Sequence, residues 1–284
     1  MSSAENVAVI GLGMIGGSVA RGLAGRGVNV IGYDKDRASI EAALAEGVIT
    51  RALSPELDDL DDTDAVVIAV YGDAAVDILP RLAPFADRLR LVTDVGSTKR
   101  AIVSAAEKSA VAARFVGAHP FAGDHRSGYA ASRFDLFEKE IVYICQTASS
   151  TPESVALAQW LWTSLGAHPL KIGAVEHDEL LAWTSHLPHM VSIALALSLA
   201  NAGVARRQLG RGGRDMVRLA AGSPDVWTAI AIDNAEAIEN ALKGFEEQIG
   251  NLRSLFKANA RDTVRERLSK ARQWTGPGEQ TSAP

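Results

Sequence analysis

Three glycines near the N-terminus, Gly11, Gly13 and Gly16, follow a short apolar run and form the pattern G-x-G-x-x-G. In this pattern the first glycine permits a tight turn, the second lets a pyrophosphate approach the backbone, and the third lets helix and strand pack closely. Free N–H groups and the dipole at the helix N-terminus then hold the phosphates. A glycine-rich turn without a ligand is the alternative. The residues expected to contact a dinucleotide here are Gly11, Gly13, Met14, Ile15 and Gly16.

An acidic residue, Asp34, directly follows the second apolar run, Val28–Tyr33, and lies 23 residues after Gly11. A carboxylate at this position accepts hydrogen bonds from an adenosine ribose and repels a 2′-phosphate. The sequence therefore predicts NAD as the cofactor. NADP remains the alternative, because Lys35 and Arg37 are nearby cations that could accommodate the phosphate.

Later apolar runs are also followed by polar residues, in the segments Asp94–Lys99 and Gly117–Gly123. Ligands of open parallel sheets lie beyond the carboxyl ends of the strands. We therefore expect one cleft that holds both cofactor and substrate. Val70 and Asp94 are expected to contact the cofactor, and Ser97 and His119 are expected to face the substrate.

His119 is the strongest candidate for proton transfer, because histidine accepts or donates a proton near neutral pH and Pro120 restricts its backbone. The alternative is a strand-end histidine satisfied by the backbone. Ser97 could hydrogen-bond the same substrate oxygen or cap the following helix, and its position taken alone favours the cap.

The second half of the chain contains the segment Ser185–His189, SHLPH. Pro188 lacks an N–H group and crowds the preceding turn, so we expect the helix to kink or restart there. Ser185 and His189, four apart, share one face if the helix continues. His186 and His189 could hold a metal, but no third ligand has matching spacing, so we predict no metal site.

A second polar group in this half comprises Asp215 and Arg218, three residues apart, with Trp227 nine residues further on. A solvated ion pair is the simple interpretation of the two charged residues.

Short β-rich runs alternate with helical stretches up to about Cys145, which predicts parallel βαβ units. After about Ile172 long Ala-, Leu- and Ile-rich segments with helical spacing take over. The predicted fold is α/β: a Rossmann-type doubly wound parallel sheet in residues 1–172, an all-α dimerisation domain in 173–274, and a disordered tail in 275–284. The expected strands are Val7–Ile10, Val28–Tyr33, Ala65–Val70, Leu89–Thr93, Arg114–Gly117, Glu140–Ile144 and His168–Ile172.

The composition excludes several classes of protein. A net charge of −5 over 284 residues gives no nucleic-acid footprint. The single cysteine, Cys145, lies in an apolar run and predicts a buried residue in a reducing compartment. Met190–Ala200 is too short to cross a membrane but too apolar to face water, so we expect a homodimer through this half. The N-terminus begins almost at the first strand, which predicts a cytoplasmic protein.

Five motifs in order, VIGLGMIGGS, DVGSTK, GAHPFAG with SGY, TSHLPH, and DMVRLAAGSPDVW leading into IAIDN, resemble the prephenate dehydrogenase family, arogenate and cyclohexadienyl dehydrogenases included. The resemblance runs from Val7 to about Asn251. It implies oxidative decarboxylation of prephenate to 4-hydroxyphenylpyruvate in tyrosine biosynthesis, with NAD or NADP, by a dimer with a helical C-terminal domain. Arogenate, or both substrates, is the alternative.

The resemblance also implies roles for single residues. His119 acts on the ring hydroxyl with help from Ser97, while His189 and Arg218 bind the substrate, Arg218 at a carboxylate. Ser185, Asp215 and Trp227 complete the substrate-binding group. The loop Asp124–Arg126 departs from the family pattern, since its acid stands one place earlier than usual. A β-hydroxyacid-type dehydrogenase and a non-catalytic dinucleotide sensor are the more remote readings.

Overall fold

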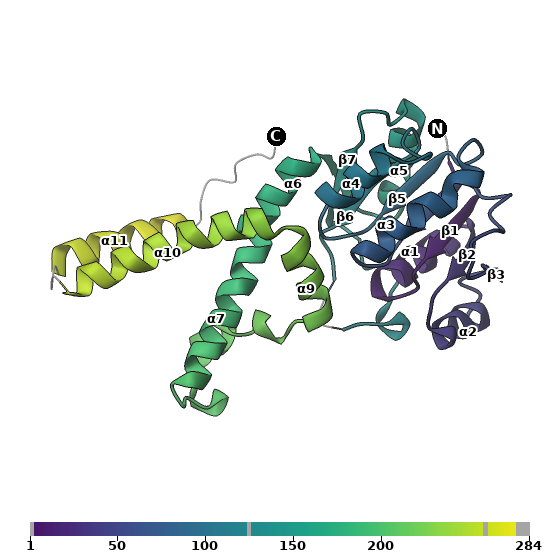
Figure 1. The fold of residues 1–284 in the computed structure, drawn as a ribbon. Helices are drawn as coiled ribbons and strands as arrows, with labels where there is room; N and C mark the ends of the chain where they lie inside the picture. Colours follow the sequence, from purple (N-terminus) through teal and green to yellow (C-terminus); the bar gives the residue numbers. More distant parts are fainter. Residues whose placement is uncertain (1–2, 124–125, 258–260, 277–284) are drawn as a thin grey trace. The chain divides into compact units, whose positions relative to one another are not determined.

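The computed structural model describes residues 3–123, 126–257 and 261–276 (Figure 1). The chain divides into two compact units, Met1–Ala235 and Glu236–Pro284, which are described separately. The sequence placed a domain boundary near residue 172, where strands give way to helices. The compact unit extends further, because the helices that follow residue 172 pack on the strand-containing part.

A parallel five-stranded sheet in the order β3-β2-β1-β4-β5 organises the first unit. The four longer strands confirm the predicted runs to within a few residues. The fifth, β3, has two residues and escaped prediction because so short a strand carries no pattern. The strands are β1 (Asn6–Ile10), β2 (Asn29–Tyr33), β3 (Arg51–Ala52), β4 (Ala65–Ile68) and β5 (Leu91–Asp94).

Helices cover both faces of this sheet, as the predicted doubly wound fold requires. Val7 and Val9 of β1 pack in one core with α1 and α5. Ala8 and Ile10 pack in a second core with α3 and α4. Burial on both faces explains why β1 is apolar at successive positions instead of alternating. The helices are α1 (Met14–Ala24), α2 (Arg37–Ala45), α3 (Asp73–Ile78), α4 (Arg100–Glu107) and α5 (Pro152–Ser164), with the 3₁₀ helix η1 (Leu79–Phe85) after α3.

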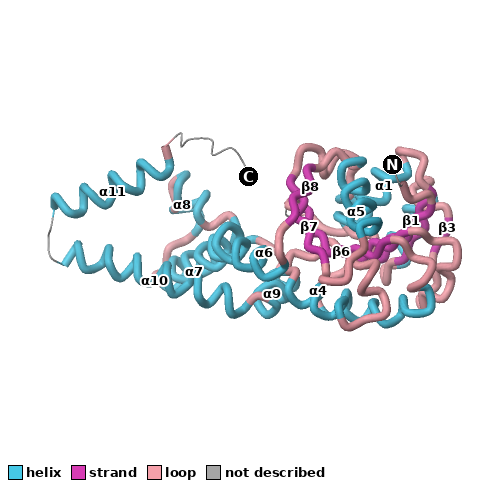
Figure 2. The backbone as a smooth tube through the Cα atoms, turned by 90° about the horizontal axis from the view of Figure 1, so that it is seen from above, coloured by secondary structure: helices cyan, strands magenta, loops and turns pink. Residues whose placement is uncertain are grey.

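Three further strands, β6 (Val116–Pro120), β7 (Ile141–Gln146) and β8 (His168–Lys171), form a second group beside the first sheet (Figure 2). A parallel bridge between Val92 and Phe115 joins the two groups. β7 and β8 are parallel, but β6 and β7 are antiparallel, unlike the expected parallel arrangement. The described part of the connection between β6 and β7 contains a 3₁₀ turn, η2 (Tyr129–Ala131), and no crossover helix, so the chain returns in the opposite direction.

One continuous helix of 28 residues, Ala174–Asn201, follows the strands. It comprises α6 (Ala174–Leu181), a π-helical turn η3 (Ala182–His186) and α7 (Leu187–Asn201). The expected break at Pro188 is thus a π turn that ends two residues before it in an unbroken helix, because the wider turn accommodates the missing N–H.

This helix is long and apolar enough to pass a length-and-composition test for a membrane span, which core helices of globular proteins also pass. The stretch Met190–Ala200, expected to be too short to cross a membrane, is only part of this longer helix. Within α7 the buried residues are Leu187 and Ser192, and Leu197 is 60% exposed. An apolar face of α7 therefore lies open in the single chain.

The first unit ends with short helices: η4 (Arg206–Gln208), α8 (Arg211–Met216), η5 (Leu219–Ala221) and α9 (Pro224–Asp233). The second unit contains most of α10 (Ala235–Lys257) together with α11 (Arg261–Thr275). Of the tail predicted to be disordered, residues 277–284 lie outside the described residues, and Thr275 ends α11.

Candidate active site

The glycine turn between β1 and α1 has the geometry expected for a dinucleotide site. Gly11 has a φ of +99°, and a Cβ atom there would lie 2.4 Å from the carbonyl oxygen of Ala69. A Cβ at Gly16 would lie 1.9 Å from the carbonyl oxygen of Gly11. At Gly13 no heavy atom lies within 4 Å of that position. The turn is therefore tight at its first and third glycines and open at its second, where a pyrophosphate would approach.

Asp34 is held at the end of β2, next to this turn. Its Oδ2 accepts the N–H of Leu12 at 2.6 Å, and its Oδ1 accepts the N–H of Asp36 at 2.8 Å. A carboxylate has about four acceptor positions, so both oxygens can still accept ribose hydroxyls. The backbone hydrogen bonds fix the carboxylate where the sequence analysis expected it to act.

The segment after His119 docks on the cofactor helix α1. A Cβ on Gly17 would lie 2.9 Å from Cβ of Ser132, and the hydroxyl of Ser18 accepts the N–H of Arg133 at 2.9 Å. Arg21 Nε donates to Ser132 Oγ at 2.7 Å. Met14, at the start of α1, would lie 3.1 Å from a Cβ on Gly123. The glycine turn and the His119 segment therefore form one wall.

His119 lies at the end of β6 and is 8% exposed. Its Nδ1 is 2.9 Å from Nε2 of His177, and Nδ1 of His177 is 2.7 Å from Oδ1 of Asp178. Burial lowers the pKa of His119 well below its usual value of 6.5, with further lowering from His177 and Lys99. His119 is consequently a neutral imidazole at physiological pH, as a proton acceptor must be.

Asp178, not Ser97, caps helix α4. Its Oδ1 accepts the N–H of Lys99 at 2.8 Å, and its Oδ2 accepts the N–H of Arg100 at 2.9 Å. The interpretation of Ser97 as the cap is therefore wrong, because a carboxylate from α6 occupies that role. Ser97 lines a pocket instead.

Asp94 is 2% exposed and pairs with the fully buried Lys99. It also accepts the N–H of Gly96 at 2.8 Å and that of Ala118 at 3.2 Å. Its oxygens are thus engaged within the protein. Asp94 shapes the loop that carries Ser97 and joins the end of β5 to β6.

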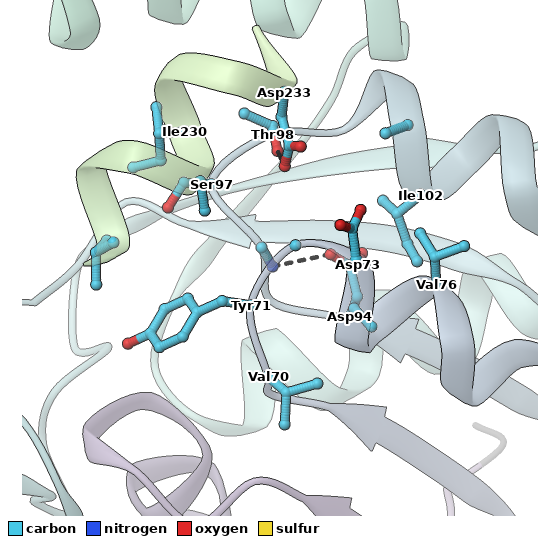
Figure 3. Close-up of a pocket in the computed structure, with 16 residues that line it drawn as sticks. Val70, Tyr71, Asp73, Val76, Asp94, Ser97, Thr98, Ile102, Ile230 and Asp233 are labelled. Atoms are coloured by element: carbon cyan, nitrogen blue, oxygen red, sulfur yellow. Dashed lines mark hydrogen bonds between the residues drawn. The ribbon is translucent and has the colours of Figure 1, made fainter. Parts of the chain in front are cut away.

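The pocket beside Ser97 lies between the ends of β4 and β5 and helices α3, α4 and α9 (Figure 3). Val70 and Ser97 line it, as the sequence analysis placed them in the cleft. Thr98 donates to Asp233 of α9 at 3.1 Å. Burial, reinforced by Asp73 and Asp178, raises the pKa of Asp233 despite the Thr98 hydrogen bond.

The helical wall contains His189, whose ring stacks on Trp227 with a centroid separation of 3.6 Å. Nδ1 of His189 donates to the carbonyl oxygen of Ser185 at 3.1 Å, so Nε2 is the free acceptor of the neutral ring. Burial lowers the pKa of His189, the hydrogen bond to Ser185 opposes this, and the charge of Arg218 lowers it further. His189 is therefore in direct contact with Ser185 and Trp227, and the charge of Arg218 is close enough to act on its ring.

His186 is buried, and its Nδ1 accepts the side-chain N–H of Asn234 at 3.1 Å. Burial lowers its pKa to about 4. Asn234 also donates to the backbone oxygen of Asp178 at 2.7 Å. His186 thus serves packing, and the described residues contain no group of three His, Cys, Asp or Glu side chains suited to a metal.

Asp215 and Arg218 are exposed on α8 and just before η5. The backbone N–H of Arg218 donates to the carbonyl oxygen of Asp215 at 3.3 Å. Among the described residues, no ion pair joins their side chains. The simple ion-pair interpretation is therefore not supported, and Arg218 faces solvent. Asp124 and His125 of the departing loop lie outside the described residues, and Arg126 is exposed.

Sequence reasoning missed His177, Asp178, Asp233 and Asn234 as members of the site. Asp233 and Asn234 appeared only as the last two letters of the motif IAIDN, which carried part of the family resemblance. His177 and Asp178 stand in an ordinary amphipathic helix, where a charged pair usually faces solvent. An unexplained adjacent His–Asp pair just after the last strand is the signal that could have found them.

Comparison with known proteins gives a consistent family. Residues 19–171 match the family model described as prephenate dehydrogenase, nucleotide-binding domain, and residues 173–270 match prephenate dehydrogenase, dimerization domain. Prephenate dehydrogenase of Bacillus subtilis is 30% identical over 88% of this chain and 70% of that protein. Cyclohexadienyl dehydrogenase of Zymomonas mobilis is 26% identical over 96% of each chain.

Solved structures agree in fold. The prephenate dehydrogenase of Aquifex aeolicus, in complex with hydroxyphenyl propionate and NAD⁺, has a TM-score of 0.88 and 29% identity, covering 95% of this chain and 97% of that one. The arogenate dehydrogenase of Synechocystis has a TM-score of 0.79 and 27% identity, covering 94% and 98%. The α/β fold with a helical C-terminal part is thereby confirmed.

Proposed function

This chain belongs to the prephenate dehydrogenase family, and we propose from the geometry of its site that it converts prephenate to 4-hydroxyphenylpyruvate and CO₂ with NAD as oxidant. The observation that carries the proposal is His119, a buried neutral imidazole on the wall shared with the dinucleotide turn. The product serves tyrosine biosynthesis in the cytoplasm.

The residues of the glycine turn fit NAD. At Gly13 the turn leaves space where its pyrophosphate would approach, and Asp34 would accept its ribose hydroxyls. Val70 lines the neighbouring pocket. NAD supplies the acceptor for the hydride that leaves the ring carbon bearing the hydroxyl.

His119 handles the proton of that hydroxyl. As the C–H electron pair leaves, the hydroxyl proton shifts toward the imidazole. As the ring–carboxylate bond breaks, its electrons complete the aromatic ring, CO₂ departs, and the proton returns to the phenol oxygen. Aromatisation makes the reaction strongly downhill, so the protein has mainly to position the reacting carbon and hold the proton. Ser97 hydrogen-bonds the same hydroxyl.

The helical wall holds the rest of the substrate. Arg218 offers a forked donor for a carboxylate, and Nε2 of His189, held by Ser185 and Trp227, offers an oriented ring nitrogen. Asp215, on α8 three residues before Arg218, adds a negative charge near the substrate-binding arginine.

Two copies of the chain assemble through the helical half. The open apolar face of α7 and the description of the matching domain as a dimerization domain support this proposal. Such a face needs a partner, since an exposed helix this apolar is costly in water.

Arogenate is the second candidate substrate, favoured by the likeness to the Synechocystis arogenate dehydrogenase. The two compounds differ in a keto or an amino group on the side chain. An acid beside that end would favour the ammonium of arogenate. The candidate acid is Asp124, so the choice rests on a loop outside the described residues.

Steady-state rates of NADH or NADPH formation test the proposal. The purified chain is assayed with prephenate or arogenate, each with NAD or NADP. We expect the highest kcat/KM with prephenate and NAD, because Asp34 repels a 2′-phosphate. A higher kcat/KM on arogenate would transfer the assignment to that substrate, and a preference for NADP would overturn the role of Asp34. No turnover with any pair would reject the function.

A further inference from the structure

His119 is linked by successive hydrogen bonds to His177 and then to Asp178. Both partners lie outside the family motifs quoted above. His177 Nε2 lies 2.9 Å from His119 Nδ1, and His177 Nδ1 lies 2.7 Å from Asp178 Oδ1. Both His177 and Asp178 have no exposed surface. Water therefore does not compete for these contacts, and the proton positions follow from the partners alone.

The carboxylate of Asp178 determines which atom donates in each hydrogen bond of this series. Burial acts to raise the pKa of Asp178, but hydrogen bonds from His177 and from the N–H groups of Arg100 and Lys99 outweigh it and lower the pKa. Ionised Asp178 only accepts hydrogen bonds, so Nδ1 of His177 carries the proton. An imidazole with its single proton on Nδ1 has a lone pair on Nε2, and at 2.9 Å this lone pair of His177 accepts from Nδ1–H of His119. The remaining nitrogen of His119, Nε2, is left as an acceptor.

The same three side chains are held from several sides. Asp178 receives the first N–H groups of α4, and its backbone carbonyl receives the side chain of Asn234. The ring of His177 packs edge-on against Tyr143 of β7, with centroids 5.4 Å apart. The pair on α6 is therefore rigid relative to the strand that carries His119.

We propose that His177 and Asp178 are positioning residues that hold His119 as the tautomer protonated on Nδ1, so that Nε2 receives the substrate hydroxyl proton. This inference rests on the proposed function for its consequence in turnover, whereas the tautomer itself is a property of the free protein. A buried histidine without such a partner has no fixed tautomer, and the wrong one presents an N–H to the hydroxyl. The helical part of the chain would thus control the base carried by the sheet.

Nitrogen-15 NMR of the intact protein with labelled histidine rings tests the tautomer directly. His119→Asn and His177→Gln identify the two sets of ring signals by their loss. We expect protonated Nδ1 and bare Nε2 at both His119 and His177 in the wild type. A proton on Nε2 of His119 overturns the proposal, and one on Nε2 of His177 overturns the role of Asp178. This result stands even if prephenate is not the substrate.

Two substitutions test the consequence for turnover. His177→Leu removes the acceptor, so His119 should become a mixture of tautomers and kcat should fall by about 10²- to 10³-fold with KM little changed. His177→Gln keeps an oxygen near the position of Nε2 and should recover part of the lost kcat.

Thr147→Val is the matched structural control, since it removes a buried hydrogen bond, 3.0 Å to the carbonyl of Ala112, away from the cleft. It should lower thermal stability with kcat unchanged. If His177→Leu folds and keeps both a single His119 tautomer and a near-normal kcat, the positioning role is wrong. If His177→Leu does not fold, His177→Gln and the wild-type tautomer decide the question.

Discussion

His119 combines a largely buried side chain with a neutral imidazole ring. Burial lowers the pKa of this side chain, so that the ring is neutral. A neutral ring is the form that accepts a proton, so burial keeps the proposed base in the form that its role requires.

Replacing His119 with Asn should lower kcat on prephenate by about 10²- to 10⁴-fold, because an amide does not take up a proton at neutral pH. KM should change little, since the side chain remains polar and of similar reach. Steady-state kinetics measures both. His168→Asn, at an exposed histidine of β8, is the matched control and should behave as wild type. A near-normal kcat for His119→Asn would make His119 structural and move the search to His189.

The pH dependence of kcat should carry the signature of the same residue. Protonation removes the lone pair, so activity falls as the pH drops. Since burial lowers the pKa of His119, the fall should begin below pH 6.5. A kcat–pH profile of the wild type measures its midpoint, and the residual activity of His119→Asn should lack this limb. An acidic limb centred above pH 6.5 would contradict the assignment.

Arg218→Ala should mainly raise KM, because the substrate carboxylate is present before and during the reaction. Arg218 is exposed in the single chain, so we expect a loss of about 10- to 100-fold in affinity, less than for a fully desolvated pair. Arg88→Ala, which breaks an exposed pair with Asp61 elsewhere, is the control. A fall in kcat at unchanged KM would instead place Arg218 at the reacting carbon.

At the scale of elements, α1 has two jobs that its sequence combines. Its N-terminus forms the dinucleotide turn, and the following Gly17 and Ser18 receive the segment that continues from β6. Gly17 lies outside the G-x-G-x-x-G pattern. A side chain there would collide with Ser132 and crowd Tyr129, because a Cβ atom would lie 2.9 Å and 3.1 Å from them. Gly17 is therefore one of the points at which α1 contacts the segment that follows His119.

Gly17→Ala should consequently destabilise the protein by about 1–3 kcal/mol, since the added methyl would lie 2.9 Å from Cβ of Ser132, closer than real contacts allow, and 3.1 Å from the ring of Tyr129. Urea denaturation measures the change in the free energy of unfolding. Gly212→Ala, in α8 with no heavy atom within 4 Å of the added Cβ, should leave stability equal or slightly raised. Equal stability of Gly17→Ala and wild type would show that the docked segment yields freely.

At the scale of the whole molecule, the exposed apolar surface of α7 is the feature that supports the proposed dimer. Leu197 is 60% exposed, and few residues of this helix are buried within the single chain. A surface of this kind is stable when a second copy covers it.

Leu197→Glu should therefore convert a dimer into monomers, because it places a charge in an apolar interface. Light scattering coupled to size exclusion at micromolar concentration measures the mass. Leu44→Glu, at a partly exposed leucine of α2, should remain a dimer. A wild-type monomer, or a Leu197→Glu dimer, would place the interface elsewhere.

Much of the framework follows from local sequence. The apolar runs predicted the longer strands because a strand buried on both faces must be apolar throughout, as β1 is. The glycine turn and Asp34 were predictable because their roles depend on backbone geometry within one βαβ unit. His119 was found because it stands where a strand must end at the ligand edge of the sheet.

The rest depends on which elements meet. Asp178 caps α4 from 78 residues away and displaces Ser97 from that role, while His177 reaches His119 across a separation of 58. β7 runs antiparallel to β6 because the described part of the connection between them has no crossover helix. No local spacing encodes these encounters. Sequence by itself determined where the cofactor turn and the proposed base, His119, lie along the chain. Tertiary packing decided which buried partners contact that histidine, because proton positions are settled only by neighbours in space.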